Sequence, residues 1–171
     1  GGQIMAIPMT VSGPWDRREV ERRDDVLVYT TSILDQDIEV TGPVSLNLHI
    51  MSSAEDTDFT GTLIDVYPDG KAIIICEGLL RCRYRDSIEE PSLMEPGTVY
   101  ELTVDMWETS NVFKSGHQIR LEVSSSNFPR FDRNLNTPHK PGMTTEIKLA
   151  DQTIFHDSER PSHLTLPIIP R

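Results

Sequence analysis

Hydrophobic and polar residues alternate strictly in four separate parts of the chain. Successive side chains of a β-strand point to opposite faces, so strict alternation predicts half-buried strands that pack one face on a core. The four alternating segments are residues 44–50, 100–106, 119–123 and 164–168. Less regular strand candidates lie at 26–30, 62–67 and 72–84, and the last is long enough to hold a bulge or bend at Gly78. Residues 144–149 add a short alternating segment.

Turn residues separate these segments and set the architecture. Gly and Pro lie between the apolar runs at 41–43, 68–70, 95–97 and 114–117, and Pro68-Asp69-Gly70 is the clearest hairpin turn. Residues 11–25 are dense in charge but have no apolar stripe at helical spacing, which indicates a solvated or interface-facing connector. About eight or nine strands with few helices predict an all-β fold, a two-sheet sandwich of the jelly-roll type.

A long irregular stretch, residues 124–143, interrupts the strands and is rich in Asn, Pro and Gly. Loops of this length are uncommon in small domains unless they have a function. It combines Phe128 and Phe131 with Arg130 and Arg133, residue types that are favoured at buried interfaces. A contact with another domain and a self-packed loop are the two interpretations.

Length and charge limit the class of protein. A chain of 171 residues is long enough for one core, so a single domain over residues 1–171 is expected. Its formal net charge of −11 repels phosphate, which argues against a nucleic-acid partner. No apolar run approaches the roughly 20 residues that span a bilayer, and no secretion signal is visible, so we expect no membrane insertion and a cytoplasmic location.

The two cysteines, Cys76 and Cys82, are too far apart along one strand to form a disulfide with each other. Neither belongs to a ligand motif for zinc. Two buried free thiols in a reducing compartment are therefore expected.

The chain carries none of the common local signatures of catalysis. The G-x-S-x-G nucleophile elbow, Gly-rich phosphate loops and H-E-x-x-H are absent. A triad from Ser124, His117 and Asp132 is conceivable, but nothing in their surroundings would activate the serine. No catalytic residue, cofactor or metal ligand is assigned.

Two other features of the sequence are candidates for binding sites. Asp56-Thr57-Asp58-Phe59-Thr60-Gly61 has part of a calcium-loop pattern but fails at its fifth and twelfth positions, which favours a strand entry with solvent-facing acids and leaves a sandwich-type calcium site open. Trp15 and Trp107 are candidates for a sugar-stacking platform, the basis of an alternative function as a carbohydrate-binding module. Packing of these tryptophans in a core or an interface is favoured.

Several stretches together resemble the C-terminal domain of the X-Pro dipeptidyl-peptidase and cocaine-esterase-like (CocE/NonD) serine hydrolases. The resemblance covers nearly the whole chain and is carried by Asp16-Arg17-Arg18, Arg23-Asp24-Asp25-Val26-Leu27-Val28-Tyr29, Val40-Thr41-Gly42-Pro43-Val44, Asp56-Thr57-Asp58-Phe59, Asp65-Val66-Tyr67-Pro68-Asp69-Gly70, Arg81-Cys82-Arg83-Tyr84-Arg85 and Ser124-Ser125-Ser126-Asn127-Phe128-Pro129-Arg130-Phe131-Asp132-Arg133-Asn134. The resemblance implies a jelly-roll sandwich related to galactose-binding-like domains.

It also implies that the catalytic serine, histidine and aspartate lie in a separate α/β-hydrolase domain upstream, which cleaves acyl esters, amides or Xaa-Pro peptides. The chain would then be non-catalytic, with the upstream hydrolase domain of the same polypeptide as its partner and homo-oligomer formation left open. Residues 1–25 would form a connector, and by alignment Met5, Ala6 and Ile7 would face the substrate pocket. The start at Gly1 without an initiator Met and the strand-like run to Arg171 lead us to expect a cut N-terminus and a natural C-terminus.

Overall fold

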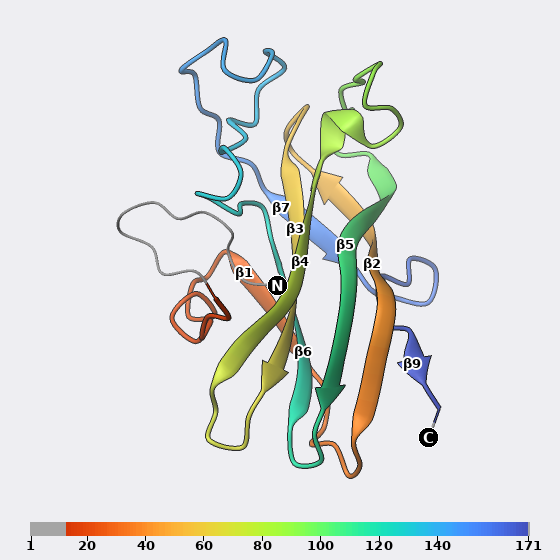
Figure 1. Ribbon diagram of the computed structural model, residues 1–171. Coiled ribbons are helices and arrows are strands. Elements are labelled where there is room, and N and C mark those ends of the chain that lie inside the picture. Colours follow the sequence, from red (N-terminus) through yellow and green to blue (C-terminus); the bar gives the residue numbers. More distant parts are fainter. Residues whose placement is uncertain (1–12, 171) are drawn as a thin grey trace.

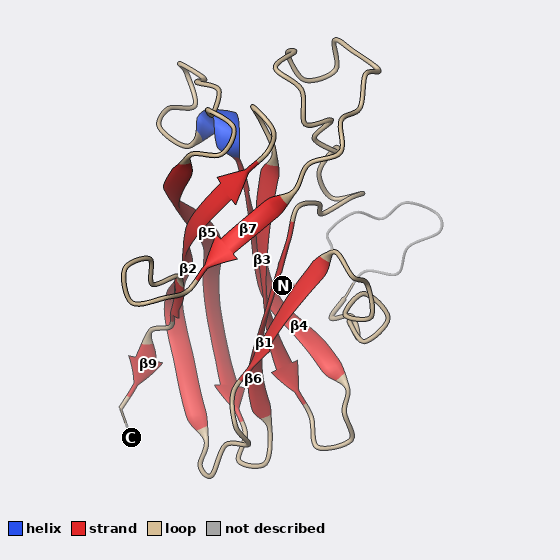
Figure 2. Ribbon diagram, turned by 180° about the vertical axis from the view of Figure 1, so that it is seen from behind, coloured by secondary structure: helices blue, strands red, loops and turns tan. Residues whose placement is uncertain are grey.

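The computed structural model describes residues 13–170, which fold into two antiparallel β-sheets packed face to face (Figure 1, Figure 2). One sheet has the strand order β1-β6-β3-β4, and in the other β5 and β7 flank the long strand β2, which also pairs with β8 and β9. The strands are β1 (Val26–Thr30), β2 (Ile38–Ser52), β3 (Asp58–Val66), β4 (Ala72–Arg81), β5 (Val99–Phe113), β6 (Gln118–Ser124), β7 (Gln152–Phe155), β8 (His163–Thr165) and β9 (Ile168–Ile169).

The core lies between the sheets and is built from the alternating residues. Its largest fully buried side chains include Leu46, Leu48 and Ile50 of β2, Leu102 of β5 and Phe59 of β3. The register places Leu48 opposite Leu102 and Ile50 opposite Tyr100, so the apolar faces of the two strands coincide. The all-β sandwich predicted from the sequence is confirmed, whereas its jelly-roll and galactose-binding-like subtype stays a prediction.

The hairpin at Pro68-Asp69-Gly70 is confirmed as the turn between β3 and β4, but β4 differs from its prediction. The extra residue of the bulge is Ile75, because Leu63 pairs with Cys76 and Ile64 pairs with Ile74. Gly78 has another role, since a Cβ atom there would lie 2.0 Å from the carbonyl oxygen of Asp105 in β5. A side chain is excluded where the backbones of β4 and β5 cross.

Three other strand predictions need correction. Residues 82–84 form a short 3₁₀ helix (Cys82–Tyr84) and do not continue β4. Residues 144–149 form no regular strand, and β7 follows them at Gln152–Phe155. The predicted C-terminal strand is divided into β8 and β9, with Leu166 and Pro167 between them. The described residues contain no helix long and apolar enough to cross a membrane.

The described part of the charged connector, residues 13–25, crosses the outer face of the four-stranded sheet. Asp16 bridges to Ile73 of β4, and the backbone N–H of Arg17 donates to the carbonyl oxygen of Ala72 at 2.8 Å. Arg17 also pairs with Glu122 of β6 at 2.6 Å. The connector is therefore partly packed on the sheet, and this cover explains why Glu122 is buried although it points away from the core.

Candidate interdomain surface

Long loops gather at one end of the sandwich, the upper end in Figure 1. Residues 82–98 connect β4 to β5, and residues 125–151 connect β6 to β7. The 125–151 segment, called here the long loop, contains the four interface residues predicted from the sequence. Most of it is without regular structure, so side-chain contacts must determine its position.

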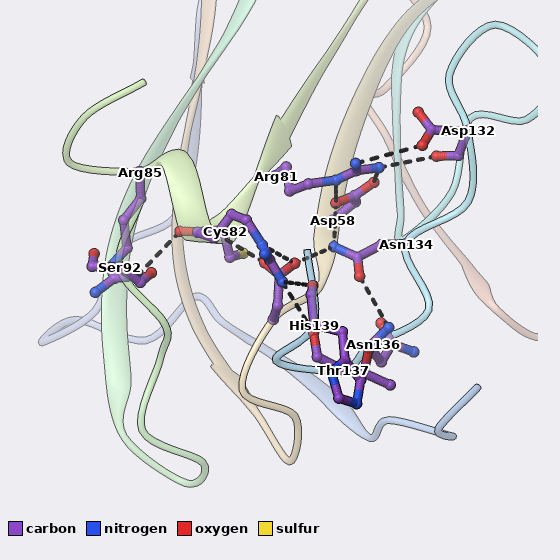
Figure 3. Close-up of polar contacts among 12 residues, drawn as sticks. Asp58, Arg81, Cys82, Arg85, Ser92, Asp132, Asn134, Asn136, Thr137 and His139 are labelled. Atoms are coloured by element: carbon purple, nitrogen blue, oxygen red, sulfur yellow. Dashed lines mark hydrogen bonds and ion pairs between the residues drawn. The ribbon is translucent and has the colours of Figure 1, made fainter. Parts of the chain in front are cut away.

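A buried ion pair holds the middle of the long loop. Arg83, in the 3₁₀ helix, donates to the carboxylate of Asp56 at 2.7 Å, and both side chains are almost fully buried. The same guanidinium donates to the carbonyl oxygens of Thr137 and His139 at 3.0 and 2.8 Å (Figure 3). Arg83 thus links the strand end directly to the backbone of the long loop.

A second ion pair lies beside the first. Arg81 donates through two nitrogens to the carboxylate of Asp58, at 2.9 and 3.0 Å, and also to the carbonyl oxygen of Asp132. The amide of Asn134 bridges the pairs, donating to Asp56 at 2.9 Å and to Asp58 at 2.7 Å (Figure 3). Asp58 and Arg81 are also opposite each other in the β3–β4 register.

The charges of this network are largely buried, so each charged group depends on its partner. Burial raises the pKa of Asp58, and hydrogen bonds from Arg81 and Asn134 offset part of that rise. Removing one partner of a buried pair leaves an uncompensated charge and costs about 3–5 kcal/mol. The expectation that Asp56 and Asp58 face solvent is therefore wrong, because the long loop and the two arginines cover them.

The beginning of the long loop is fixed by Glu77 of β4, which points to the outer face of the sheet. Arg130 pairs with the Glu77 carboxylate at 2.5 Å, and the side-chain amide of Asn127 donates to it at 2.9 Å. The Arg130 side chain therefore points toward the outer face of the sheet. These contacts do not test the prediction that Arg130 contacts another domain.

Several apolar side chains of the long loop are exposed. Phe128 is 59% exposed, and the guanidinium of Arg133 stacks 5.0 Å from the centre of its ring. Leu149 is 99% exposed, and Met143 and Ile147 are also largely in solvent. Exposed aromatic, Met and Arg side chains are the types enriched in the centre of protein interfaces. The arrangement is suited to contact with another protein surface.

The other candidate residues of the sequence have varied outcomes. Phe131 lies half-buried beside Arg130, whose guanidinium is 5.5 Å from the ring centre. Trp107 of β5 is 65% exposed, and its φ is 66°. The prediction that it packs in the core is therefore wrong for the core of this domain, and packing in an interface stays a prediction. Met5, Ala6 and Ile7 lie outside the described residues.

The conceivable triad is not assembled. His117 lies before β6 and bonds through its Nδ1 to Asp65 at 2.8 Å, whereas Ser124 ends β6 and pairs with Thr60 at 2.7 Å. The length of β6 thus separates the histidine from the serine, and Asp132 is near Arg81. In residues 13–170, no group of three or more His, Cys, Asp or Glu side chains is placed to hold a metal ion.

Both cysteines are buried free thiols, as predicted. Burial raises the pKa of Cys76 to about 11 and raises that of Cys82 as well. A thiol with a raised pKa has little thiolate at neutral pH, so these cysteines are poor nucleophiles.

The described residues thus define a β-sandwich domain with an anchored long loop that leaves several apolar side chains exposed. The sequence matches, over residues 8–165, the family described as the X-Pro dipeptidyl-peptidase C-terminal non-catalytic domain, and the chain belongs to this family. It is 50% identical to cocaine esterase of Rhodococcus sp. (strain MB1 Bresler) over 162 residues, which is 94% of this chain and 28% of that protein.

Solved structures agree with this assignment. An aminopeptidase from the marine sediment archaeon Thaumarchaeota archaeon matches with a TM-score of 0.85 and 29% identity, covering 91% of this chain and 27% of that one. An alpha-amino acid ester hydrolase matches with a TM-score of 0.83 and 29% identity, covering 90% and 27%. The chain thus spans about a quarter of the length of these relatives.

Proposed function

We propose that this chain is the C-terminal domain of a serine hydrolase that cleaves acyl ester, amide or Xaa-Pro bonds, and that it packs on the α/β-hydrolase domain and helps to form the substrate cleft. The long loop is the main contact surface. Four residues of the loop contact the hydrolase domain: Phe128, Arg130, Phe131 and Arg133. The pairing of Arg130 with Glu77 also holds the loop in position. Met5, Ala6 and Ile7 face the substrate pocket, and the parent enzyme is cytoplasmic.

One observation carries this proposal. A network of buried ion pairs fixes a loop whose apolar side chains are then left in solvent, Leu149 completely. Exposed Leu, Ile, Met and Phe side chains are unfavourable in water, and ordering a long loop costs conformational entropy. Both costs are offset when a partner surface covers the apolar side chains.

A carbohydrate-binding module is the second candidate, favoured by the exposure of Trp107 and of Trp15. Trp107 also has a left-handed backbone conformation, which is uncommon for a residue other than glycine and is found mostly at functional sites. A glycan array tests this function. Binding that is lost in Trp107→Ala would favour the module, and an array without signal would remove it.

The non-catalytic role predicts that the purified chain does not hydrolyse p-nitrophenyl esters or Xaa-Pro anilides. The parent protein should hydrolyse substrates of one of these classes, because its nucleophile lies in the other domain. Turnover by the isolated chain that a serine-directed inhibitor abolishes would overturn the proposal.

The contact surface is tested by Leu149→Asp in the isolated chain and in the parent protein. The isolated chain should keep its melting temperature, because residue 149 is already in solvent. In the parent the aspartate would be buried without a partner, which costs about 3 kcal/mol and should release the domain from the hydrolase domain. Differential scanning calorimetry measures both proteins.

Ile33→Asp is the matched control. Ile33 is 67% exposed in the connection between β1 and β2, at the opposite end of the sandwich from the long loop (Figure 2). We expect no change in either protein. If Leu149→Asp leaves the parent as stable as this control does, the long loop is not the contact surface.

A further inference from the structure

The edge strand β1 carries side chains that point into the sandwich but are not covered. Leu27 and Tyr29 are opposite Val123 and Leu121 of β6, so the register places them on the core face of the sheet. Nevertheless Leu27 is 43% exposed and Tyr29 is 37% exposed. Core-facing side chains with this exposure show that the sandwich is open beside β1.

The facing sheet is uncovered in the same place. Ile154 of β7 is opposite Ile50, and Leu164 of β8 is opposite Leu46, so both also point inward, and both are only partly buried. Between the two sheets lies a cavity of about 450 Å³, lined by Leu, Ile and Val side chains from β2, β6, β7 and β8 together with polar residues of β1 and of the segment after β7. Tyr29 and His156 stand edge to face across its opening, with ring centres 5.9 Å apart.

The backbone of β1 is also incomplete as part of a sheet. Among the described residues β1 pairs only with β6, so its other edge has no strand beside it. A free edge next to exposed apolar side chains invites aggregation, and natural proteins usually cover such edges. The same place therefore lacks both hydrogen-bond partners and apolar cover.

We infer that a β-strand from the polypeptide preceding residue 1 adds to the free edge of β1 and places alternate apolar side chains in this cavity. The family is a C-terminal domain, and the chain spans only 28% of cocaine esterase, so ample polypeptide precedes it in a protein of that kind. This inference rests on the domain order of the proposed function but not on the contact made by the long loop.

A strand fits these features better than a small molecule. The cavity is open along β1, and an added strand supplies main-chain hydrogen bonds to the edge while its alternate side chains enter the space. A second copy of the chain could pair through β1, but then the fraction of paired chains would depend on protein concentration. This difference makes the occupants separable by experiment.

Two cysteine reporters test the inference, Tyr29→Cys and, should that variant fold poorly, Leu27→Cys. Each is placed in the 171-residue chain, in the chain extended by its native preceding residues up to the hydrolase domain, and in the full parent. A maleimide measures the rate of labelling. Cys76 and Cys82 are buried and contribute little, and Ile33→Cys, in an exposed turn, is the accessible control.

We expect the reporter to react quickly in the 171-residue chain and at least about tenfold more slowly in the extended chain and the parent, with the control fast throughout. Fast labelling in the parent would overturn the inference. Protection in the parent but not in the extended chain would also overturn it, because the hydrolase domain would then cover β1. Protection of the 171-residue chain that increases with concentration would assign the edge to a second copy instead.

These outcomes are separate from those of the proposed function. If the long loop does not contact the hydrolase domain, Leu149→Asp is neutral in the parent while the reporters on β1 can still be protected. If no strand adds to β1, the reporters react quickly while Leu149→Asp can still destabilise the parent.

Discussion

The two long sides of the sandwich differ in how they are closed. On one side β4 and β5 cross with their backbones in contact, so close that Gly78 has no room for a side chain (Figure 1). On the other side β1 stands apart from β7 and β8, and the space between them is a cavity of about 450 Å³. The described residues close the β4–β5 side by themselves, whereas the side beside β1 is open.

The closed side contributes to the folding of the domain, whereas the open side and the long loop are the surfaces available for contact. The closed side is part of the core, which includes Met106, Phe113 and Cys76. These side chains are buried within the domain alone. The open side and the long loop carry apolar side chains in solvent, including Leu27 and Leu149. The proposed function accounts for both kinds of surface, because a domain of a larger enzyme would make its contacts with the other domains only in the parent.

The largest effect is expected from filling the closed side, with Gly78→Ala. The new Cβ would meet the backbone of Asp105 at 2.0 Å, so a strand must move, and we expect a loss of at least about 4 kcal/mol in urea unfolding. Gly61→Ala is the control, since its Cβ would meet the mobile ends of Leu46 and Met106, and about 1 kcal/mol is expected. Equal losses would show that the closed side is not rigid.

A smaller effect is expected when one apolar side chain is truncated on each side of the sandwich. Leu102→Ala removes a fully buried side chain opposite Leu48 and should cost about 3 kcal/mol, whereas Leu121→Ala beside the cavity should cost about 1 kcal/mol in the isolated chain. In the parent the cost of Leu121→Ala should increase, because the cavity is then filled. Chemical denaturation of both variants in both proteins measures this, and an unchanged cost in the parent would contradict a completed open side.

The fold was predictable where one physical signal dominates. In β2, β5 and β6 one face is buried and the other is polar, so alternation predicts both the strands and their orientation, as with Leu46 and Leu48. The segment at 144–149 also alternates, but its apolar side chains, such as Ile147 and Leu149, lie in solvent. Alternation alone therefore does not establish that a segment packs on the core of this domain.

The ion-pair network shows why the site was only partly predictable. Asp58 and Arg81 are opposite each other only because Ile75 is an extra residue in β4. Without that bulge the same hairpin would place Leu80 opposite Asp58. A bulge leaves little trace in a uniformly apolar run such as residues 72–76, so the burial of the carboxylates could not be derived from the turn alone.

Composition singled out the loop residues as interface candidates but does not determine how their side chains are oriented. Phe and Arg side chains in an irregular stretch indicate an interface. Phe128 and Arg133 are both exposed, and the guanidinium of Arg133 stacks on the Phe128 ring. Arg130 instead pairs with Glu77, a partner 53 positions away whose proximity depends on the sheet order. Such long-range pairing is set by topology and has no local sequence signal.

Hydrogen–deuterium exchange on the isolated chain and on the parent protein tests the account most directly. We predict that the long loop and β1 exchange more slowly in the parent, because the hydrolase domain and the preceding polypeptide cover them. The crossing of β4 and β5 should exchange at the same slow rate in both proteins. Equal exchange of the long loop in the two proteins would contradict the claim that this domain acts through that surface.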